Sequence, residues 1–281
     1  MEAFRDAVNA GNNFQGKTVR LAADITLRDG WKPIGEGSRK VGGANIEARN
    51  ATTFFRGTFD GAGKTISHLN NKGFAPTQMR LVRDGNVDTY AYGLFALVGD
   101  GAEVKNLTLS DVDIDTNRYT NAIGDSVGAL IGYSDGSLKV EGVTVNGNVV
   151  AGDAVGGLVG RSYNSTGLFE TVQSPFAYTI SGCTNNANVT AGTAVNQKGA
   201  GFIGFASVPG LGTTITNNTN NGTITGGQVK DGHQLKASIA LINWEVMGEE
   251  RVVSGNKNGS ASADALASWK QGNTTAIGAL D

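Results

Sequence analysis

The residues best suited to chemistry are three aspartates that alternate with apolar residues in the run Asp111-Val112-Asp113-Ile114-Asp115. Such alternation is typical of a β-strand, with the two apolar side chains facing inward and the carboxylates facing outward. Successive carboxylates would then stand ~6.6 Å apart, twice the rise per strand residue. This spacing is near that of the carboxylate pair in inverting glycoside hydrolases, and carboxylate oxygens also bind Ca²⁺. A solvent-facing strand edge kept soluble by charge explains the same run, and we prefer this interpretation. The aligned positions of the following repeat are Asn146, Gly147 and Asn148, so the aspartates are a unique feature of one repeat, which mildly favours a function.

Other catalytic arrangements are not supported by the sequence. A zinc peptidase needs two histidines one helical turn apart, and this chain has only His68 and His233, far apart in the sequence. Cys183 is the only cysteine, which excludes an intrachain disulfide and a thiolate metal cluster. No serine stands beside a credible histidine and aspartate pair. We therefore expect no catalytic residue, no cofactor and no bound metal.

A segment rich in aromatic residues, Arg161 to Thr179, is the best candidate for binding. Its aromatic residues, in a chain that is 7% aromatic, are Tyr163, Phe169, Phe176 and Tyr178. Aromatic side chains beside amides suit stacking on sugar faces or contact with a protein. Alternatively, the segment folds back over a small cluster of its own.

Two further segments, Glu36 to Thr53 and Lys72 to Ala91, carry most of their charge as lysine and arginine. These basic residues are Arg39, Lys40, Arg49, Lys72, Arg80 and Arg83. A local basic patch would favour acidic glycans, although long charged loops are commonly just solvated. The overall net charge of −2 gives no cationic field of the kind that nucleic acid selects, so we expect no nucleic-acid partner.

The elements that would position these residues follow a repeat, in which an Ile or Val is followed three and five residues later by Leu, Val, Cys or Asn. The sets are Ile66-Leu69-Asn71, Val104-Leu107-Leu109, Val140-Val143-Val145, Ile180-Cys183-Asn185, Ile215-Asn218-Asn220 and Val253-Asn256-Asn258. Their first residues are 38, 36, 40, 35 and 38 positions apart. A period held this closely indicates stacked structural units.

A short glycine-bounded apolar run precedes each set from Val104 onward. These runs are Gly93-Leu94-Phe95-Ala96, Gly128-Ala129-Leu130-Ile131-Gly132, Gly156-Gly157-Leu158-Val159-Gly160, Gly201-Phe202-Ile203-Gly204 and a weaker Ala240-Leu241-Ile242, where Asn243 replaces the closing glycine. From the end of each run to the next Ile or Val there are 8, 8, 20, 11 and 10 residues. The aromatic segment is therefore an insertion, and insertions are where solenoids usually carry function.

Strands this short cannot bury an apolar face alone, but stacked units share one interior and pair their backbones. The sequence therefore predicts an all-β fold, a right-handed parallel β-helix, rather than a propeller, which needs four antiparallel strands in each blade. Inside a unit the apolar phase shifts at Ser110-Asp111, as expected where a strand turns a corner.

We expect three regions along the chain: an N-terminal cap over residues 1–20, repeats over 21–260 and a C-terminal cap over 261–281. The first cap is predicted to contain a helix with Phe4, Ala7 and Val8 on one face and Gly11 at its end. The Ala-rich stretch Ser262 to Trp269 is predicted to form a short closing helix. No apolar run near 18 residues occurs, so we expect no transmembrane segment.

Several runs together resemble the GLUG-motif repeat proteins. They are Leu21-Ala22-Ala23-Asp24-Ile25-Thr26-Leu27, Trp31-Lys32-Pro33-Ile34-Gly35 and the stretch from Phe55 to Ile66, followed by the Gly-Leu-Phe and Gly-Gly-Leu-Val-Gly runs. Such repeats occur in exported bacterial surface proteins and in the non-peptidase regions of immunoglobulin-A-cleaving metallopeptidases. The resemblance implies a β-helix, an extracellular or cell-surface location and an adhesin-like or scaffold role.

Three functional hypotheses follow. In the first, the chain is a non-catalytic, exported bacterial surface protein that binds a host glycan or a host surface protein through its side loops, as a monomer or as a module of a larger protein. In the second, it is a polysaccharide lyase or glycosidase that uses Asp111, Asp113 and Asp115. In the third, it is a structural stalk.

Overall fold

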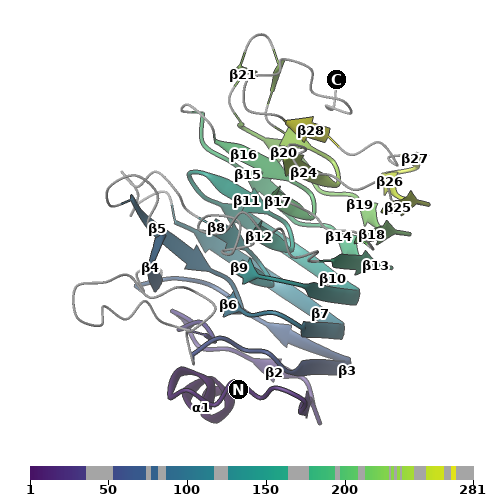
Figure 1. Cartoon of the computed structure of the whole chain (residues 1–281). Helices are drawn as coiled ribbons and strands as arrows, with labels where there is room; N and C mark the ends of the chain where they lie inside the picture. Colours follow the sequence, from purple (N-terminus) through teal and green to yellow (C-terminus); the bar gives the residue numbers. More distant parts are fainter. Residues whose placement is uncertain are drawn as a thin grey trace, which may run out of the picture.

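The computed structural model describes residues 1–35, 53–73, 77–81, 87–116, 126–163, 177–193, 197–207, 213–227, 229–230, 233–234, 236–243, 251–262 and 267–269. In these residues the fold is almost entirely β, with one helix, α1 (Glu2–Asn9), at the N-terminal end of a stack of strands (Figure 1). The strands form three large sheets and one two-stranded pair. The expected all-β class is thus confirmed.

The largest sheet contains fourteen of the described strands. They are β1 (Thr18–Arg20), β2 (Ile25–Thr26), β3 (Thr58–Ser67), β7 (Ala102–Asp115), β10 (Leu138–Val150), β13 (Tyr178–Ser181), β14 (Thr184–Asn185), β15 (Asn188–Thr190), β18 (Thr213–Thr216), β19 (Thr219–Asn220), β20 (Ile224–Thr225), β25 (Arg251–Ser254), β26 (Lys257–Asn258) and β27 (Ala261–Ser262).

Two six-stranded sheets complete the stack. The second sheet holds β4 (Thr77–Leu81), β5 (Val87–Tyr92), β8 (Ser126–Gly128), β11 (Ala154–Gly156), β16 (Lys198–Ala200) and β23 (Lys236–Ala237). The third sheet holds β6 (Phe95–Val98), β9 (Ile131–Asp135), β12 (Val159–Tyr163), β17 (Ile203–Ser207), β24 (Ala240–Asn243) and β28 (Ala267–Trp269). A separate antiparallel pair joins β21 (Val229–Lys230) to β22 (His233–Gln234).

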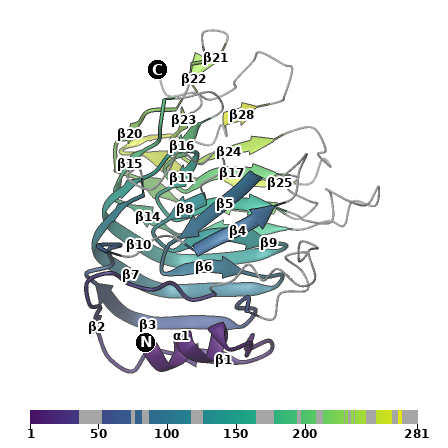
Figure 2. The same ribbon diagram turned by 90° about the vertical axis from the view of Figure 1, so that its left-hand side faces the viewer.

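Strands of successive repeats pair in parallel, one repeat apart. Val140 pairs with Val104 and with Ile180, and Ile215 pairs with Ile180 and Val253. These partners are the ones that the repeat predicts, because an inward apolar position in one unit must stack on its equivalent in the next. Figure 2 shows the strands of successive repeats lying side by side along the stack.

The register of the first repeat differs from the prediction. Val104 pairs with Phe59, 45 residues earlier, and Ile66 pairs with Leu109 instead of Val104. The register also shifts between Asp60 and Lys64. A phenylalanine at the inward position and extra residues in β3 hid the true alignment from the sequence pattern.

Corners recur at one equivalent position of each repeat, where the backbone adopts a left-handed conformation. Reading along the stack, these residues and their φ angles are Asn106 (53°), Gly142 (59°), Gly182 (60°), Asn217 (56°) and Gly255 (70°). Glycine and asparagine tolerate positive φ better than other residues, which explains why only these two types occupy the five positions. The predicted second corner also exists, since Asp111 has φ 52° and the register between β7 and β10 shifts there.

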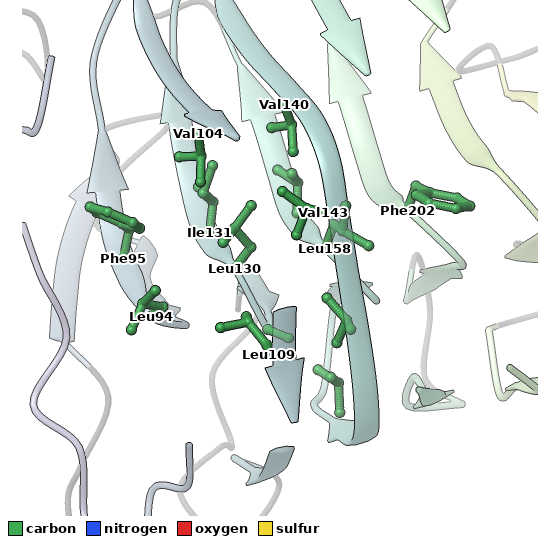
Figure 3. Packing of buried hydrophobic residues seen from close by; sticks show 14 of the residues in the cluster. Leu94, Phe95, Val104, Leu109, Leu130, Ile131, Val140, Val143, Leu158 and Phe202 are labelled. Atoms are coloured by element: carbon green, nitrogen blue, oxygen red, sulfur yellow. The ribbon is translucent and has the colours of Figure 1, made fainter. Parts of the chain in front are cut away.

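All three large sheets contribute to the core, the second through Tyr92, Val127 and Val155. Side chains of the glycine-bounded runs, such as Leu94, Phe95 and Ile131, face Val104 and Val140 across the interior (Figure 3). All five are fully buried. The second and third sheets approach closely, because a β-carbon on Gly204 would lie 2.6 Å from backbone atoms of Val155. The glycines of these runs are therefore needed for close packing of backbones, in addition to turns.

The N-terminal helix is confirmed and closes one end of the stack (Figure 1). Gly11 follows it with φ 104°, as a helix C-terminus favours. Phe4 stacks on Phe59 at a centroid distance of 5.7 Å and meets Phe95 edge-on at 6.3 Å. Strand pairing already begins at Thr18, inside the region predicted as cap.

The predicted C-terminal helix is wrong where the structure describes it. Ala267–Trp269 form β28, which pairs in parallel with β24. Alanine has the highest intrinsic helix propensity, but propensity is worth less than about 1 kcal/mol per residue, whereas the edge of β24 offers a row of backbone groups to pair with. Backbone pairing along the stack therefore outweighs local propensity.

Candidate functional site

The three aspartates of β7 face outward, as predicted. Asp111 and Asp113 are exposed and Asp115 is half-buried, while Val112 and Ile114 between them are buried. However, the corner at Asp111 bends the strand, so the three carboxylates do not form one straight row. Asp115 is held to the preceding repeat through its backbone, which exchanges two hydrogen bonds with the Asn71 side chain at 2.7 and 3.0 Å.

Asp111 contacts a histidine that the sequence pattern did not connect with it. The Nδ1 atom of His68 lies 2.9 Å from Oδ2 of Asp111, and its Nε2 atom lies 3.0 Å from Oδ1 of Asp29. The three residues come from successive repeats and form one row across them. With the true register, Ile66 aligns with Leu109, so that His68 aligns with Asp111. The signal was therefore present in the sequence but lay in the misaligned repeat.

Protonation of His68 lets it donate to both carboxylates of this row. A neutral imidazole has one N–H and can donate to one carboxylate only, whereas donation to both requires the protonated ring. The hydrogen bonds to Asp111 and, secondly, Asp29 hold the pKa of His68 above its ordinary value. The same bond from His68 lowers the pKa of Asp29. All three side chains are solvent-accessible, which limits the strength of the interaction through screening.

The row does not provide a converging set of catalytic or metal-binding groups. The carboxylate of Asp111 is engaged by His68, and Asp113 pairs in register with Asn148 rather than with another acid. Within the described parts of the chain, no group of three His, Cys, Asp or Glu side chains could hold a metal ion.

The aromatic segment is only partly described. Tyr163 is the last residue of β12, where its backbone pairs with Asp135; its side chain, together with Phe169 and Phe176, lies outside the described residues. The prediction that Tyr178 binds a ligand is wrong. Tyr178 begins β13, and its side chain is 1% exposed in the hydrophobic core. A buried ring cannot stack on a ligand, so Tyr178 is a core residue. The basic segments named above lie largely outside the described residues.

A buried ion cluster lies at the start of the aromatic segment. Asp153 accepts hydrogen bonds from Arg161 at 2.7 Å and from Lys198 at 3.2 Å. Both cations lie over the ring of Phe205, at 5.5 and 5.1 Å from its centroid. Burial lowers the pKa of Lys198. The cluster joins β12, β16 and β17, and sequence reasoning missed it because Lys198 is 45 residues from Asp153.

The outward face of the largest sheet changes character beyond β7. In the next three repeats its outward side chains between the two corners and just after them carry no charge. These residues, which we call the uncharged face, are Thr144, Asn146, Asn148 and Val150; Thr184, Asn186, Asn188 and Thr190; and Thr219, Asn221, Thr223 and Thr225. All are exposed or half-buried.

Comparison with known proteins gives a limited result. No family model matches the chain, and no solved structure matches it. Among curated proteins, Halomucin of Haloquadratum walsbyi is 32% identical over 157 residues, which cover 55% of this chain and 2% of Halomucin. The chain thus spans about 2% of the length of this relative. No helix in the described residues is long and apolar enough to cross a membrane.

Proposed function

We propose that this chain is a non-catalytic, exported bacterial surface module with an adhesin-like role, which binds a host glycan or host surface protein. Its scaffold is a right-handed parallel β-helix related to the GLUG-motif repeat proteins. The parallel pairing between equivalent residues one repeat apart supports this scaffold. The resemblance in sequence supports the family, and the partial likeness to Halomucin is compatible with an extracellular or cell-surface location.

The observation that carries a binding role is the uncharged face. Its side chains are accessible, polar except for Val150, and held in register over three successive repeats. A repeated, rigid surface of this kind suits a ligand that is itself extended or repetitive. The inserted segment 164–176, which follows β12 in the sequence and lies outside the described residues, is proposed as a second contact for the same ligand.

The test is a binding screen combined with an assay for turnover. The chain is applied to arrays of host glycans and host matrix proteins, and the same polysaccharides are incubated with it and assayed for new reducing or unsaturated ends. We expect binding to at least one glycan or protein without cleavage of any. Cleavage that disappears in an Asp113→Ala variant would establish the carbohydrate-active enzyme instead.

A variant lacking residues 164–176 tests the contribution of the insertion. The deletion starts after Tyr163 and ends before β13, so that it leaves both flanking strands intact. We expect weaker binding with an unchanged unfolding midpoint. If neither the intact chain nor this variant binds anything on the arrays, the adhesin-like role is wrong and a structural stalk is the better explanation.

A further inference from the structure

The uncharged face is bounded by charged residues on both sides along the stack. Asp111 and Asp113 precede it on β7, and Lys257 follows Thr219 in the last described repeat. Between them, the twelve positions of the uncharged face carry eleven amides and hydroxyls, one aliphatic side chain (Val150) and no ionisable group; the ion pair of Lys139 and Glu141 lies on the same side of β10, before its first corner. Because surface positions of proteins are commonly occupied by Lys, Glu, Asp and Arg, this composition is unusual for a solvent-exposed sheet.

The amides of this face are fixed in ladders that run along the stack. Asn186 donates to the Oδ1 atom of Asn146 at 2.8 Å and accepts from Asn221 at 2.8 Å. A second ladder continues from Asn148 through Asn188, whose Oδ1 atom accepts from the Thr223 hydroxyl at 2.7 Å. All members of a ladder therefore point the same way, with little rotational freedom left to lose on binding.

The ladders leave hydrogen-bonding capacity unused on the solvent side. An asparagine amide has two N–H donors and two acceptor lone pairs, and a ladder contact uses one of each. Asn186 thus keeps one donor and one acceptor free to bind another group. Asn188 keeps one donor, because its Oδ1 atom accepts from both the backbone N–H and the hydroxyl of Thr223. Neighbouring rungs are separated by the strand spacing of about 4.8 Å, and outward residues along a strand by about 6.6 Å.

The chemistry of this face selects the class of ligand. A sulfated or carboxylated glycan would find no cation to compensate its charge among these twelve positions. A neutral polysaccharide carries hydroxyls that donate and accept in equal measure, as the face does. Preoriented donors and acceptors lose little conformational entropy on binding. Because both the face and the polysaccharide are repetitive, many weak contacts form at once and raise the overall affinity.

We propose that the uncharged face binds a neutral polysaccharide, through hydrogen bonds from the Asn and Thr ladders to sugar hydroxyls. This inference rests on the proposed glycan-binding function and specifies its ligand class and its site. It also separates the binding face from the buried Asp153 cluster and from the charged row at His68, neither of which has the composition to favour an uncharged ligand.

The experiment measures affinity for dextran, galactomannan, xyloglucan and chitin hexasaccharide, with heparin and polygalacturonate as acidic probes. Thr223→Lys introduces a charge at an exposed rung of the face, and Thr18→Lys makes the same substitution at an exposed position of β1. Thr223→Ser keeps the hydroxyl. Thr225→Lys is a second face variant, in case Thr223→Lys lowers the unfolding midpoint.

We expect at least one neutral probe to bind with an affinity that is unchanged between about 0.05 and about 0.5 M NaCl, because no ionic contact is involved. The Thr223→Lys and Thr225→Lys variants should bind it roughly five- to tenfold more weakly, as expected for the loss of one or two hydrogen bonds. Thr18→Lys and Thr223→Ser should bind as the unmodified chain does.

Two results would overturn this inference while leaving the proposed function intact. One is binding to acidic probes only, weakened by salt. The other is binding to a neutral probe that is unaffected by both face variants but lost on deletion of residues 164–176. Absence of binding to every polysaccharide and every host protein would instead remove the proposed function itself.

Discussion

One interior position of the repeat is occupied by aliphatic residues near the N-terminal end of the stack and by asparagines near the C-terminal end. Towards the N-terminus these positions hold aliphatic residues such as Leu109 and Val145, next to a cluster of phenylalanines around Phe59. Towards the C-terminus the same column continues as Asn185, Asn220 and Asn258. One backbone architecture thus accommodates a core held by dispersion and hydrophobic burial and a core held by amide hydrogen bonds.

The interior asparagines near the C-terminal end form hydrogen bonds with one another from repeat to repeat. The Nδ2 atom of Asn185 donates to Asn220 at 2.8 Å, and that of Asn220 donates to Asn258 at 2.9 Å. A parallel ladder links Asn218 to Asn256 at 2.9 Å. Because a buried amide is costly unless paired, each rung depends on its neighbours, whereas each aliphatic residue contributes on its own. The two ends should therefore respond differently to substitution.

The largest effect is expected at the phenylalanine cluster. Phe59 is fully buried and contacts Phe4 and Phe95, so Phe59→Ala would leave a cavity that this closely packed end cannot fill. We expect a loss of about 3–5 kcal/mol in the free energy of unfolding. Phe59→Leu, which keeps most of the volume, should cost less than about 1.5 kcal/mol. Urea unfolding measures both, and equal losses would show that packing is not what holds this end.

A second, smaller effect is expected from breaking a ladder. Asn220→Ala removes the acceptor of Asn185 and the donor to Asn258 and to the Gly222 carbonyl. We expect a loss of about 2–3 kcal/mol, because buried partners are left unsatisfied. Asn220→Leu should be at least as harmful, although it restores apolar volume. A stable Asn220→Leu protein would show that the amides only fill space.

A third test adds an asparagine next to the end of the interior ladder, and for comparison at a position with no asparagine neighbour. At Val145 a new amide would lie next to Asn185, whose Oδ1 atom accepts from Ala187 and has a second lone pair. At Val104 the neighbours in register are Phe59 and Val140, which offer no such acceptor. Both Val→Asn variants should be destabilised, but Val145→Asn by about 1 kcal/mol less, the worth of one hydrogen bond. Equal unfolding midpoints would contradict a directional ladder.

The sequence predicted the alignment of the repeats correctly where the inward residue is Val or Ile. It predicted the wrong alignment where another residue type and a register shift occur. Val104, Val140, Ile180 and Ile215 pair as their spacing indicated. The first repeat was misaligned because Phe59 replaces the expected aliphatic residue and β3 contains a register shift.

The same misalignment concealed the best-defined charged contact of the surface, between His68 and Asp111. Other features required three dimensions. Asp153 directly precedes β11, Arg161 lies on β12 of the third sheet and Lys198 on β16 of the second, so only the folded chain brings all three together. Tyr178 followed an insertion and therefore resembled a loop residue, although strand pairing with β10 and β18 places it in the core. The sequence shows asparagines at equivalent positions of successive repeats. That they form ladders, and in which direction each amide donates, depends on hydrogen bonds that the spacing does not reveal.

The smallest predicted effect concerns pH and the charged row on the N-terminal side. The folded-state pKa of His68 is raised, so protonated His68 contributes stability that is fully present below its ordinary pKa of about 6.5 and is lost as pH rises through the raised value. Asp29 has the opposite sign: its pKa is lowered, so its contribution is present above about 3.9 and is lost as pH falls through the lowered value. The row should therefore be most stabilising between these two ranges.

The variant His68→Asn isolates this contribution. Asparagine tolerates the positive φ of 66° at this position, and it cannot carry the charge that binds both carboxylates. The unfolding midpoint of the unmodified chain should exceed that of the variant near pH 5 and converge with it near pH 9, while His233→Asn should leave this pH-dependent difference unchanged. A difference that stays constant over this range would mean that His68 is not protonated in the folded chain. The row would then be held by a single hydrogen bond, and the amide ladders would remain the better-defined polar links between repeats.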